Sequence, residues 1–225
     1  MTVSFSQTTL IGDIGITQPT VLQWGPDGRL YVASLTGDIA VLTIAQDASG
    51  NFVIQSREII HLVHDMPNHN DDGSYNGAVA GRQVTGLVVG GTAEAPILYV
   101  SSSDPRVGGG AAGTDTGLDT NSGVISRLTL DGGTWDKVDI VRGLPRSENN
   151  HSTNGLAFGP DGTTLLVAQG GMTNAGAPSN NLAGATEYAL SGAILEIDLT
   201  QIAQLEAAGV HSYQVGSAAT QFYVY

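Results

Sequence analysis

His151 is the residue of this chain whose type and setting most invite a chemical role. It lies within residues 144–162, LPRSENNHSTNGLAFGPDG, where a polar loop runs into a short apolar strand and closes on a Gly-Pro-Asp-Gly turn. A neutral imidazole near physiological pH is a competent proton acceptor, and a polar loop would keep it neutral. The residues themselves leave two interpretations open: a surface histidine, or the base of an active site.

A second group of candidate residues lies in the polar loop 61–83. It contains six potential metal ligands: His61, His64, Asp65, His69, Asp71 and Asp72. Their spacing matches no zinc signature. The oxygens of residues 70–74 and of residues 115–121 do not follow the spacing of a calcium loop either. We therefore expect a solvated polar loop at 61–83 rather than a metal centre.

Several common catalytic and nucleotide-binding motifs are missing from the sequence. There is no Gly-x-Ser-x-Gly elbow, no phosphate-binding Walker loop and no dinucleotide fingerprint. The glycine-rich stretch GGGAAG at 108–113 does not stand between a strand and a helix, so its glycines serve flexibility. A serine hydrolase or a nucleotide-binding protein has no support here.

The charge balance narrows the class of partner. The formal net charge is −13, from 21 acidic and 8 basic residues, which disfavours nucleic acid and anionic membranes as partners. The absence of cysteine excludes disulfides and thiolate metal sites. No apolar run reaches the roughly eighteen residues of a membrane-spanning helix, and the N-terminus lacks the basic and hydrophobic regions of a secretory signal.

The elements that must position these side chains are short strands joined by tight turns. With 31 glycines and only 13% charged residues, the composition suits many strands and turns. Strand–turn–strand units recur at 18–44, 83–104, 123–141 and 151–171, the last followed by a strand at 189–199. The turn Gly-Pro-Asp-Gly occurs in two of them, with proline presetting φ and glycine accepting a positive φ.

This repetition predicts an all-β chain built as a β-propeller with four-stranded antiparallel blades. About three to four blades of a probable six would be present, so residues 1–225 form a partial propeller domain. A β-sandwich is the alternative, but it explains the recurring turn less well. The long polar loops should gather on one face, and one short helix is expected at 200–209, with Gly209 at its C-cap.

The chain stops at ATQFYVY, inside a predicted strand. We therefore expect a C-terminally truncated domain, or several chains that associate to complete the ring. An exposed sheet edge readily pairs with another chain, so a homo-oligomer is a fair expectation.

Residues 142–162 closely resemble a segment of the soluble quinoprotein glucose and sorbosone dehydrogenase family. In that family a Gly-Leu-Pro loop leads to a histidine, a strand and Gly-Pro-Asp-Gly. QPTVLQWGPDGRLYVA looks like its first blade, and DDGSYNGAVAGRQVTGLVVGG looks like its Gly-Gln-x-Gly-Leu segment. The resemblance covers most of residues 15–200.

The resemblance implies a six-bladed propeller that binds pyrroloquinoline quinone and calcium and oxidises a small-molecule sugar or related alcohol. It also implies a secreted or periplasmic location. His151 matches the family's general base, which takes the hydroxyl proton, and Gln83 matches the glutamine that hydrogen-bonds the cofactor. Asn150 and Gln169 stand at neighbouring positions of that pattern and are expected at the cofactor as well.

A second interpretation is a non-catalytic propeller module that binds carbohydrate or protein. The family has an acidic residue where this chain has Asn150, and an aspartate of its pattern is missing from residues 168–171. Its calcium ligands and the basic residues for the quinone would lie beyond the end of this chain. A shared fold does not by itself carry function.

Overall fold

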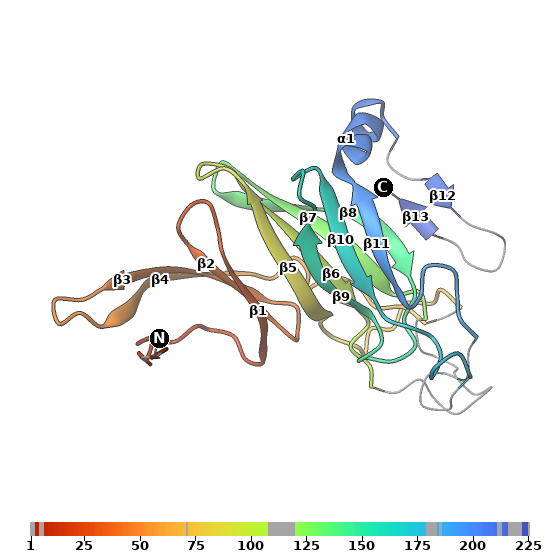
Figure 1. Cartoon of the computed structure of the whole chain (residues 1–225), viewed down its shortest axis with the longest axis horizontal. Coiled ribbons are helices and arrows are strands. Elements are labelled where there is room, and N and C mark those ends of the chain that lie inside the picture. Colours follow the sequence, from red (N-terminus) through yellow and green to blue (C-terminus); the bar gives the residue numbers. More distant parts are fainter. Residues whose placement is uncertain are drawn as a thin grey trace.

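The computed structural model describes residues 3–4, 7–70, 72–107, 120–178, 184 and 186–210, and the backbone alone at 213–215 and 222–224. Asp71, the GGGAAG stretch at 108–113 and residues 115–119 lie outside the described residues. The described part contains thirteen strands and one helix (Figure 1). The chain is therefore an all-β protein, as the sequence predicts.

The strands form three antiparallel sheets. The first contains, in spatial order, β1 (Pro19–Trp24), β2 (Leu30–Ser34), β3 (Ile39–Gln46) and β4 (Phe52–Ile60). The second contains β5 (Gln83–Gly91), β6 (Pro96–Ser103), β7 (Gly123–Asp131) and β8 (Thr134–Leu144), with β13 (Phe222–Val224) and then β12 (Tyr213–Val215) added beyond β8. The third contains β9 (Thr153–Phe158), β10 (Thr164–Gln169) and β11 (Ala193–Asp198).

The two Gly-Pro-Asp-Gly turns have the predicted geometry. In the turn between β1 and β2, Gly28 donates its N–H to the Gly25 carbonyl at 3.1 Å and has φ +73°. In the turn between β9 and β10, Gly162 bonds Gly159 at 3.0 Å and has φ +69°. A positive φ at the fourth position is cheap only for glycine, so local sequence sets both hairpins.

The second sheet is buried on both faces. Leu87, Val89 and Leu98 belong to one core cluster with residues of the first sheet. Val88 and Tyr99, which alternate with them along β5 and β6, belong to another cluster with residues of the third sheet. Successive side chains of a strand point to opposite faces, so the apolar runs of β5 and β6 supply two cores at once.

Aromatic pairs join the sheets at both of these layers. The rings of Tyr31 in the first sheet and Trp135 in the second meet edge to face at 6.3 Å. Those of Tyr99 in the second sheet and Phe158 in the third meet edge to face at 5.8 Å. This arrangement is a favoured geometry for aromatic side chains and fixes how neighbouring sheets sit on one another.

The predicted helix is confirmed as α1 (Leu199–Ala207). The carboxylate of Asp198 caps its N-terminus by accepting the N–H of Gln201 at 2.9 Å. Gly209 follows the C-cap residue Ala208 with φ +74°, in the left-handed conformation that often ends a helix. No helix in the described residues has the length and apolar character needed to cross a membrane.

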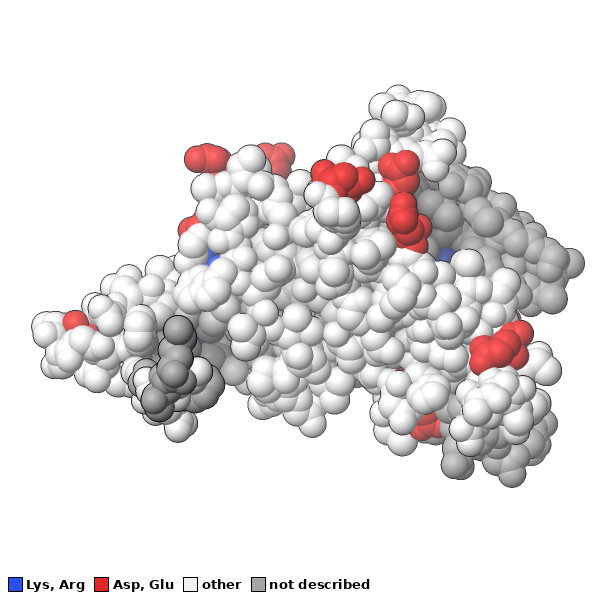
Figure 2. Space-filling view, in the orientation of Figure 1, with Lys and Arg blue, Asp and Glu red and all other residues white. Residues whose placement is uncertain are grey.

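The fold prediction is confirmed at the level of strands and sheets. Four-stranded antiparallel units are present in the first and second sheets, whereas the third sheet has three strands. The three described sheets do not close into a ring, so the propeller arrangement stays a prediction. Acidic side chains are scattered over the face seen in Figure 2, with almost no basic surface between them.

Replacing Leu98 tests the core between the first and second sheets. Its side chain is fully buried there. We expect Leu98→Ala to lower the free energy of unfolding by about 2–5 kcal/mol, because the shortened side chain leaves a cavity. Leu22→Ala on β1, where the side chain is 66% exposed, is the matched control. Equal midpoints of the two variants in urea would contradict this packing.

Candidate functional site

The loops that follow β2, β4, β6 and β8 form a chain of contacts, each bonded to the next. Arg82 donates its N–H to the Thr36 carbonyl at 3.2 Å, linking the β4–β5 loop to the β2–β3 loop. Arg106 donates to the His69 carbonyl at 2.6 Å. The buried Arg146 in turn donates to the Arg106 carbonyl. The described parts of these loops therefore contact one another, through the main chain at Arg82 and through the side chains of Arg106 and Arg146.

His151 is the last residue of a tight turn in the loop between β8 and β9. The turn spans Glu148–His151, with the His151 N–H bonded to the Glu148 carbonyl at 3.0 Å. Ser147 closes it by donating its N–H to the His151 carbonyl at 3.2 Å. The His151 side chain is half-buried as a result, with its backbone held on both sides.

The imidazole of His151 has a defined orientation. Its Nδ1 lies 3.3 Å from the carbonyl oxygen of Gly171. A carbonyl oxygen can only accept a hydrogen bond, so the proton of the neutral ring sits on Nδ1. Nε2 then carries the lone pair, and no residue in the described part of the chain bonds it. This is the tautomer that a proton acceptor at Nε2 requires.

Gln83 and Gln169 brace the loop that carries His151. Gln83, at the start of β5, donates its amide hydrogen to the Asn149 carbonyl. Gln169, at the end of β10, donates to the Pro145 carbonyl at 2.6 Å and accepts from the Thr153 hydroxyl at 2.9 Å. Both glutamines are buried, at 6% and 5% exposure. One strand of the second sheet and one strand of the third sheet thus hold the loop.

The structure brings the four predicted site residues to this one loop. His151 and Asn150 belong to it, and Gln83 and Gln169 bond its backbone. Asn150 lies at the exposed tip of the turn. The two glutamines therefore donate their amide N–H groups to main-chain carbonyl groups of the loop. The sequence had led us to expect that these side chains bond a cofactor, and it did not indicate this bracing role.

An open cavity of about 320 Å³ adjoins the loop. Its lining residues come from β9, β10, β11 and the two ends of the β10–β11 loop: Asn154, Ala168, Gln169, Gly170, Gly192, Ala193 and Ile194. His151 is not among them, but its backbone rests on Gly170, one of the lining residues. The cavity offers the Asn154 amide as its main polar side chain beside that of Gln169.

The three histidines of the loop 61–83 have separate polar partners, although the rings of His61 and His64 lie edge to face with their centroids 6.4 Å apart. His61 Nδ1 pairs with Asp38 at 2.8 Å, and His64 Nδ1 pairs with Asp65 at 2.9 Å. His69 lines a separate cavity of about 150 Å³ together with Arg82 and Asp139. Among the described residues, no group of three histidine or acidic side chains is placed to hold a metal ion.

Glu187 anchors the segment that offers its carbonyl to His151. The carboxylate accepts the N–H groups of Met172 at 3.0 Å and Thr173 at 3.1 Å, and the hydroxyls of Thr173 and Ser191. Burial opposes ionisation, but these hydrogen bonds outweigh it and lower the pKa of Glu187 from 4.5 to about 2. Gly171 precedes the two bonded amides and is held with them.

Sequence reasoning did not identify Gly170, Arg146 or Glu187 as parts of this site. A Cβ atom at Gly170 would lie 2.6 Å from the carbonyl carbon of His151, so only glycine lets the two segments touch. Arg146 is fully buried despite its charge. The one available sequence signal was the rarity of basic residues in so acidic a chain, which marks each arginine as unusual.

Comparisons with known proteins give only distant likenesses. No protein-family model and no curated protein matches the chain. Two solved structures of Trichoderma reesei Carbohydrate-Active Enzymes Family AA12 are similar to it, an iodide structure (TM-score 0.48, 15% identity) and a calcium structure (TM-score 0.44, 13% identity). Each match covers 84% of this chain and 37% of the other, so the chain spans little more than a third of those proteins.

The expected membership in the soluble quinoprotein glucose and sorbosone dehydrogenase family is wrong. No family model matches the chain, and the described sheets do not close into a propeller. The physical reason lies in the motifs behind the resemblance. Gly-Pro-Asp-Gly turns and polar loops before strands are needed wherever short antiparallel strands reverse, so they recur in unrelated sheets.

Replacing Gly170 by alanine tests the contact that positions His151. The added methyl group would push the His151 backbone away and lengthen the bond from Nδ1 to Gly171. We expect the nitrogen NMR shifts of the neutral His151 ring to show the Nδ1–H form in the native protein and a mixture of tautomers in Gly170→Ala. Gly155→Ala, where a Cβ meets nothing within 4 Å, is the control. A native ring protonated on Nε2 would refute the assignment.

Glu187 should make stability depend on pH in the acid range. Its pKa is lowered on folding, so its stabilising effect is present above about pH 4.5 and is lost as the pH falls toward about 2. We expect the urea midpoint of Glu187→Gln to fall less over this range than that of the native protein. Glu94→Gln, at an exposed turn, should behave as the native protein does. Parallel curves for all three proteins would contradict the prediction.

Proposed function

We propose that this chain forms the base-bearing part of a protein that oxidises a sugar or related alcohol. The observation that carries the proposal is the tautomer of His151, whose Nδ1–H faces the Gly171 carbonyl and leaves the Nε2 lone pair unpartnered among the described residues. General bases that take a hydroxyl proton need such a nitrogen, held in one orientation. The braces from Gln83 and Gln169 supply that rigidity.

In this proposal the loop works as a fixed support. Substrate binding would bring a hydroxyl hydrogen within hydrogen-bond reach of Nε2, and the imidazole would take that proton. The hydride of the carbon that bears this hydroxyl would pass to a two-electron acceptor that the described residues do not hold. The positive charge that develops on the ring would strengthen the bond from Nδ1–H to the Gly171 carbonyl. Glu187, through its bonds to Met172 and Thr173, would keep that carbonyl in place.

The described residues do not fit pyrroloquinoline quinone or calcium, the groups that the sequence resemblance implied. Carboxylates of the quinone would need basic partners, yet Arg106 forms an ion pair with the buried Asp104 at 2.5 Å. Arg82 and Arg146 donate to carbonyl oxygens of Ser122 and Arg106. No described cluster provides three metal ligands. We therefore assign to this chain the proton acceptor alone.

A second candidate function is a binding module for carbohydrate or protein without catalysis. The observation that favours it is the use of Gln83 and Gln169 as braces, which takes their N–H groups away from any ligand. The open cavity of about 320 Å³ beside Asn154 would then be the place where a sugar binds. Amide side chains in an open, partly apolar hollow suit hydroxyl-rich ligands.

The test is aldose-dependent dye reduction by the purified chain, with free pyrroloquinoline quinone added as a soluble electron acceptor because the described residues hold none. We expect turnover that falls by about 10²–10⁴-fold in His151→Ala, the usual effect of losing a general base. His61→Ala, which removes an exposed histidine paired with Asp38, should leave it unchanged.

An equal loss in both variants, or no loss in His151→Ala, would contradict the catalytic proposal. Absence of turnover together with saturable binding of an aldose by calorimetry, weakened in Asn154→Ala, would support the binding module instead. Retained binding in Asn154→Ala would remove the cavity from consideration.

A further inference from the structure

The third sheet ends in a strand whose outer edge is free. β11 pairs with β10 along its whole length, from Thr164 opposite Asp198 to Gln169 opposite Ala193. In the described part of the chain, no strand pairs with the other edge of β11. The outer edge of β8 differs, because β13 covers part of it. The unpaired N–H and C=O groups of an edge strand are a template for a further strand.

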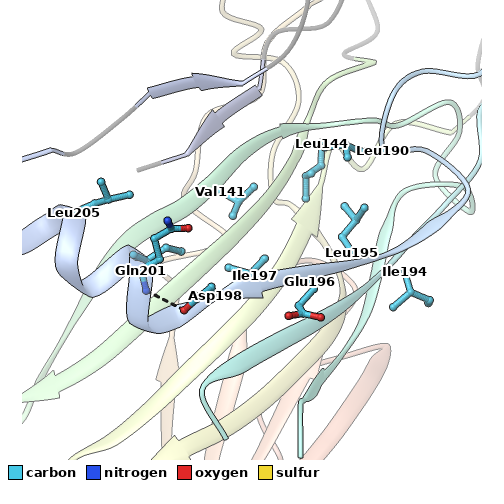
Figure 3. A pocket seen from close by; sticks show the side chains of 11 residues that line it. Val141, Leu144, Leu190, Ile194, Leu195, Glu196, Ile197, Asp198, Gln201 and Leu205 are labelled. Atoms are coloured by element: carbon cyan, nitrogen blue, oxygen red, sulfur yellow. Dashed lines mark hydrogen bonds between the residues drawn. The ribbon is translucent and has the colours of Figure 1, made fainter. Parts of the chain in front are cut away.

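An apolar groove of about 360 Å³ runs along this free edge. Leu195 and Ile197 project from β11 toward β8, and Val141 and Leu144 of β8 face them (Figure 3). Ile202 and Leu205 of α1 close one end. The groove therefore lies between the inner faces of the second and third sheets, where it continues their shared core.

The other two sheets show what fills the equivalent position. Each has a fourth strand, β4 or β8, whose inward side chains enter the core between the first and second sheets. Ile60 of β4 and Trp135 of β8 both lie in that core. A fourth strand beside β11 would place alternate side chains in the groove in the same way. The groove thus has the position and the apolar lining that such a strand needs.

We propose that the edge of β11 and this groove bind an extended segment of a partner polypeptide, which adds to the third sheet as its fourth strand. The segment alternates apolar and basic side chains. Apolar residues fill the groove, and basic residues face Glu196 and Asp198, which are exposed along β11 and also line the groove. Strand addition gains affinity from main-chain hydrogen bonds and specificity from alternate side chains.

The charges on β11 select the class of partner. Antiparallel pairing with β11 of a second copy would set Glu196 opposite Glu196, Asp198 or Ile194. Like charges directly opposite each other destabilise a strand pair, and opposite charges stabilise it. The net charge of −13 adds a general repulsion between copies. A basic, alternating segment is therefore favoured over self-association.

The test uses the full chain and a short fluorescent peptide of alternating lysine and valine, followed by fluorescence anisotropy at physiological salt. We expect this peptide to bind at least about tenfold more tightly than one with a central proline, which removes a main-chain donor, and than one of alternating glutamate and valine. Glu196→Lys should shift the preference toward the glutamate peptide.

Leu205→Arg tests the groove itself, because it places a long charged side chain in the apolar lining. We expect it to weaken binding of the lysine peptide by at least about tenfold, whereas Leu22→Arg on the exposed face of β1 should not. Circular dichroism would establish that both variants are folded.

Three outcomes would overturn the proposal. Equal affinity for the proline-containing peptide would mean attraction by charge alone, without strand pairing. Binding of no peptide by the folded native chain would leave the edge without this partner. A dimer in sedimentation that Leu205→Arg dissociates would assign the groove to a second copy. None of these results depends on whether His151 is catalytic.

Discussion

The burial of the second sheet on both faces is the constraint on which the rest of the structure depends. Its strands alternate between two cores, so that Leu87 and Val89 pack on the first sheet while Val88 packs on the third. A sheet packed on each face removes both sets of apolar side chains from water. Three sheets in series follow from this, and with them the alignment of every loop that joins one sheet to the next.

The candidate site is a consequence of that alignment. Loops from successive sheets end side by side, and buried polar side chains must then find partners in the neighbouring loop. Arg106 and Arg146 do so through backbone carbonyls, as do Gln83 and Gln169. The same hydrogen bonds that satisfy these groups also hold His151 in one orientation. The stability of these loops and the orientation of His151 therefore rest on one network of hydrogen bonds.

The third sheet differs from the other two because, among the described residues, it has three strands and no fourth strand. The apolar core between two sheets is covered by both of them. The fourth strand of the first and of the second sheet covers the margin of the core between them. Leu195 and Ile197 of β11 pack on the core, whereas Ile194, Glu196 and Asp198, which alternate with them, are exposed. No strand in the described part of the chain pairs with the outer edge of β11, and the proposed strand addition would take place there.

The sequence by itself determined the local elements. Alternating apolar residues specified the strands, Gly-Pro-Asp-Gly specified two hairpins, and Asp198 and Gly209 bounded the helix, because each of these depends on a few adjacent residues. It also singled out His151, Gln83, Asn150 and Gln169, although through a family resemblance that the comparisons overturn.

Only the tertiary structure decided what those residues touch. The bracing role of Gln83 and Gln169, the tautomer of His151 and the free edge of β11 all depend on contacts between segments far apart in the chain. Gln83 and Asn149, for example, are 66 residues apart. Such contacts are set by how whole sheets pack on one another, and the periodicity of a single strand carries no information about which carbonyl will lie opposite a given side chain.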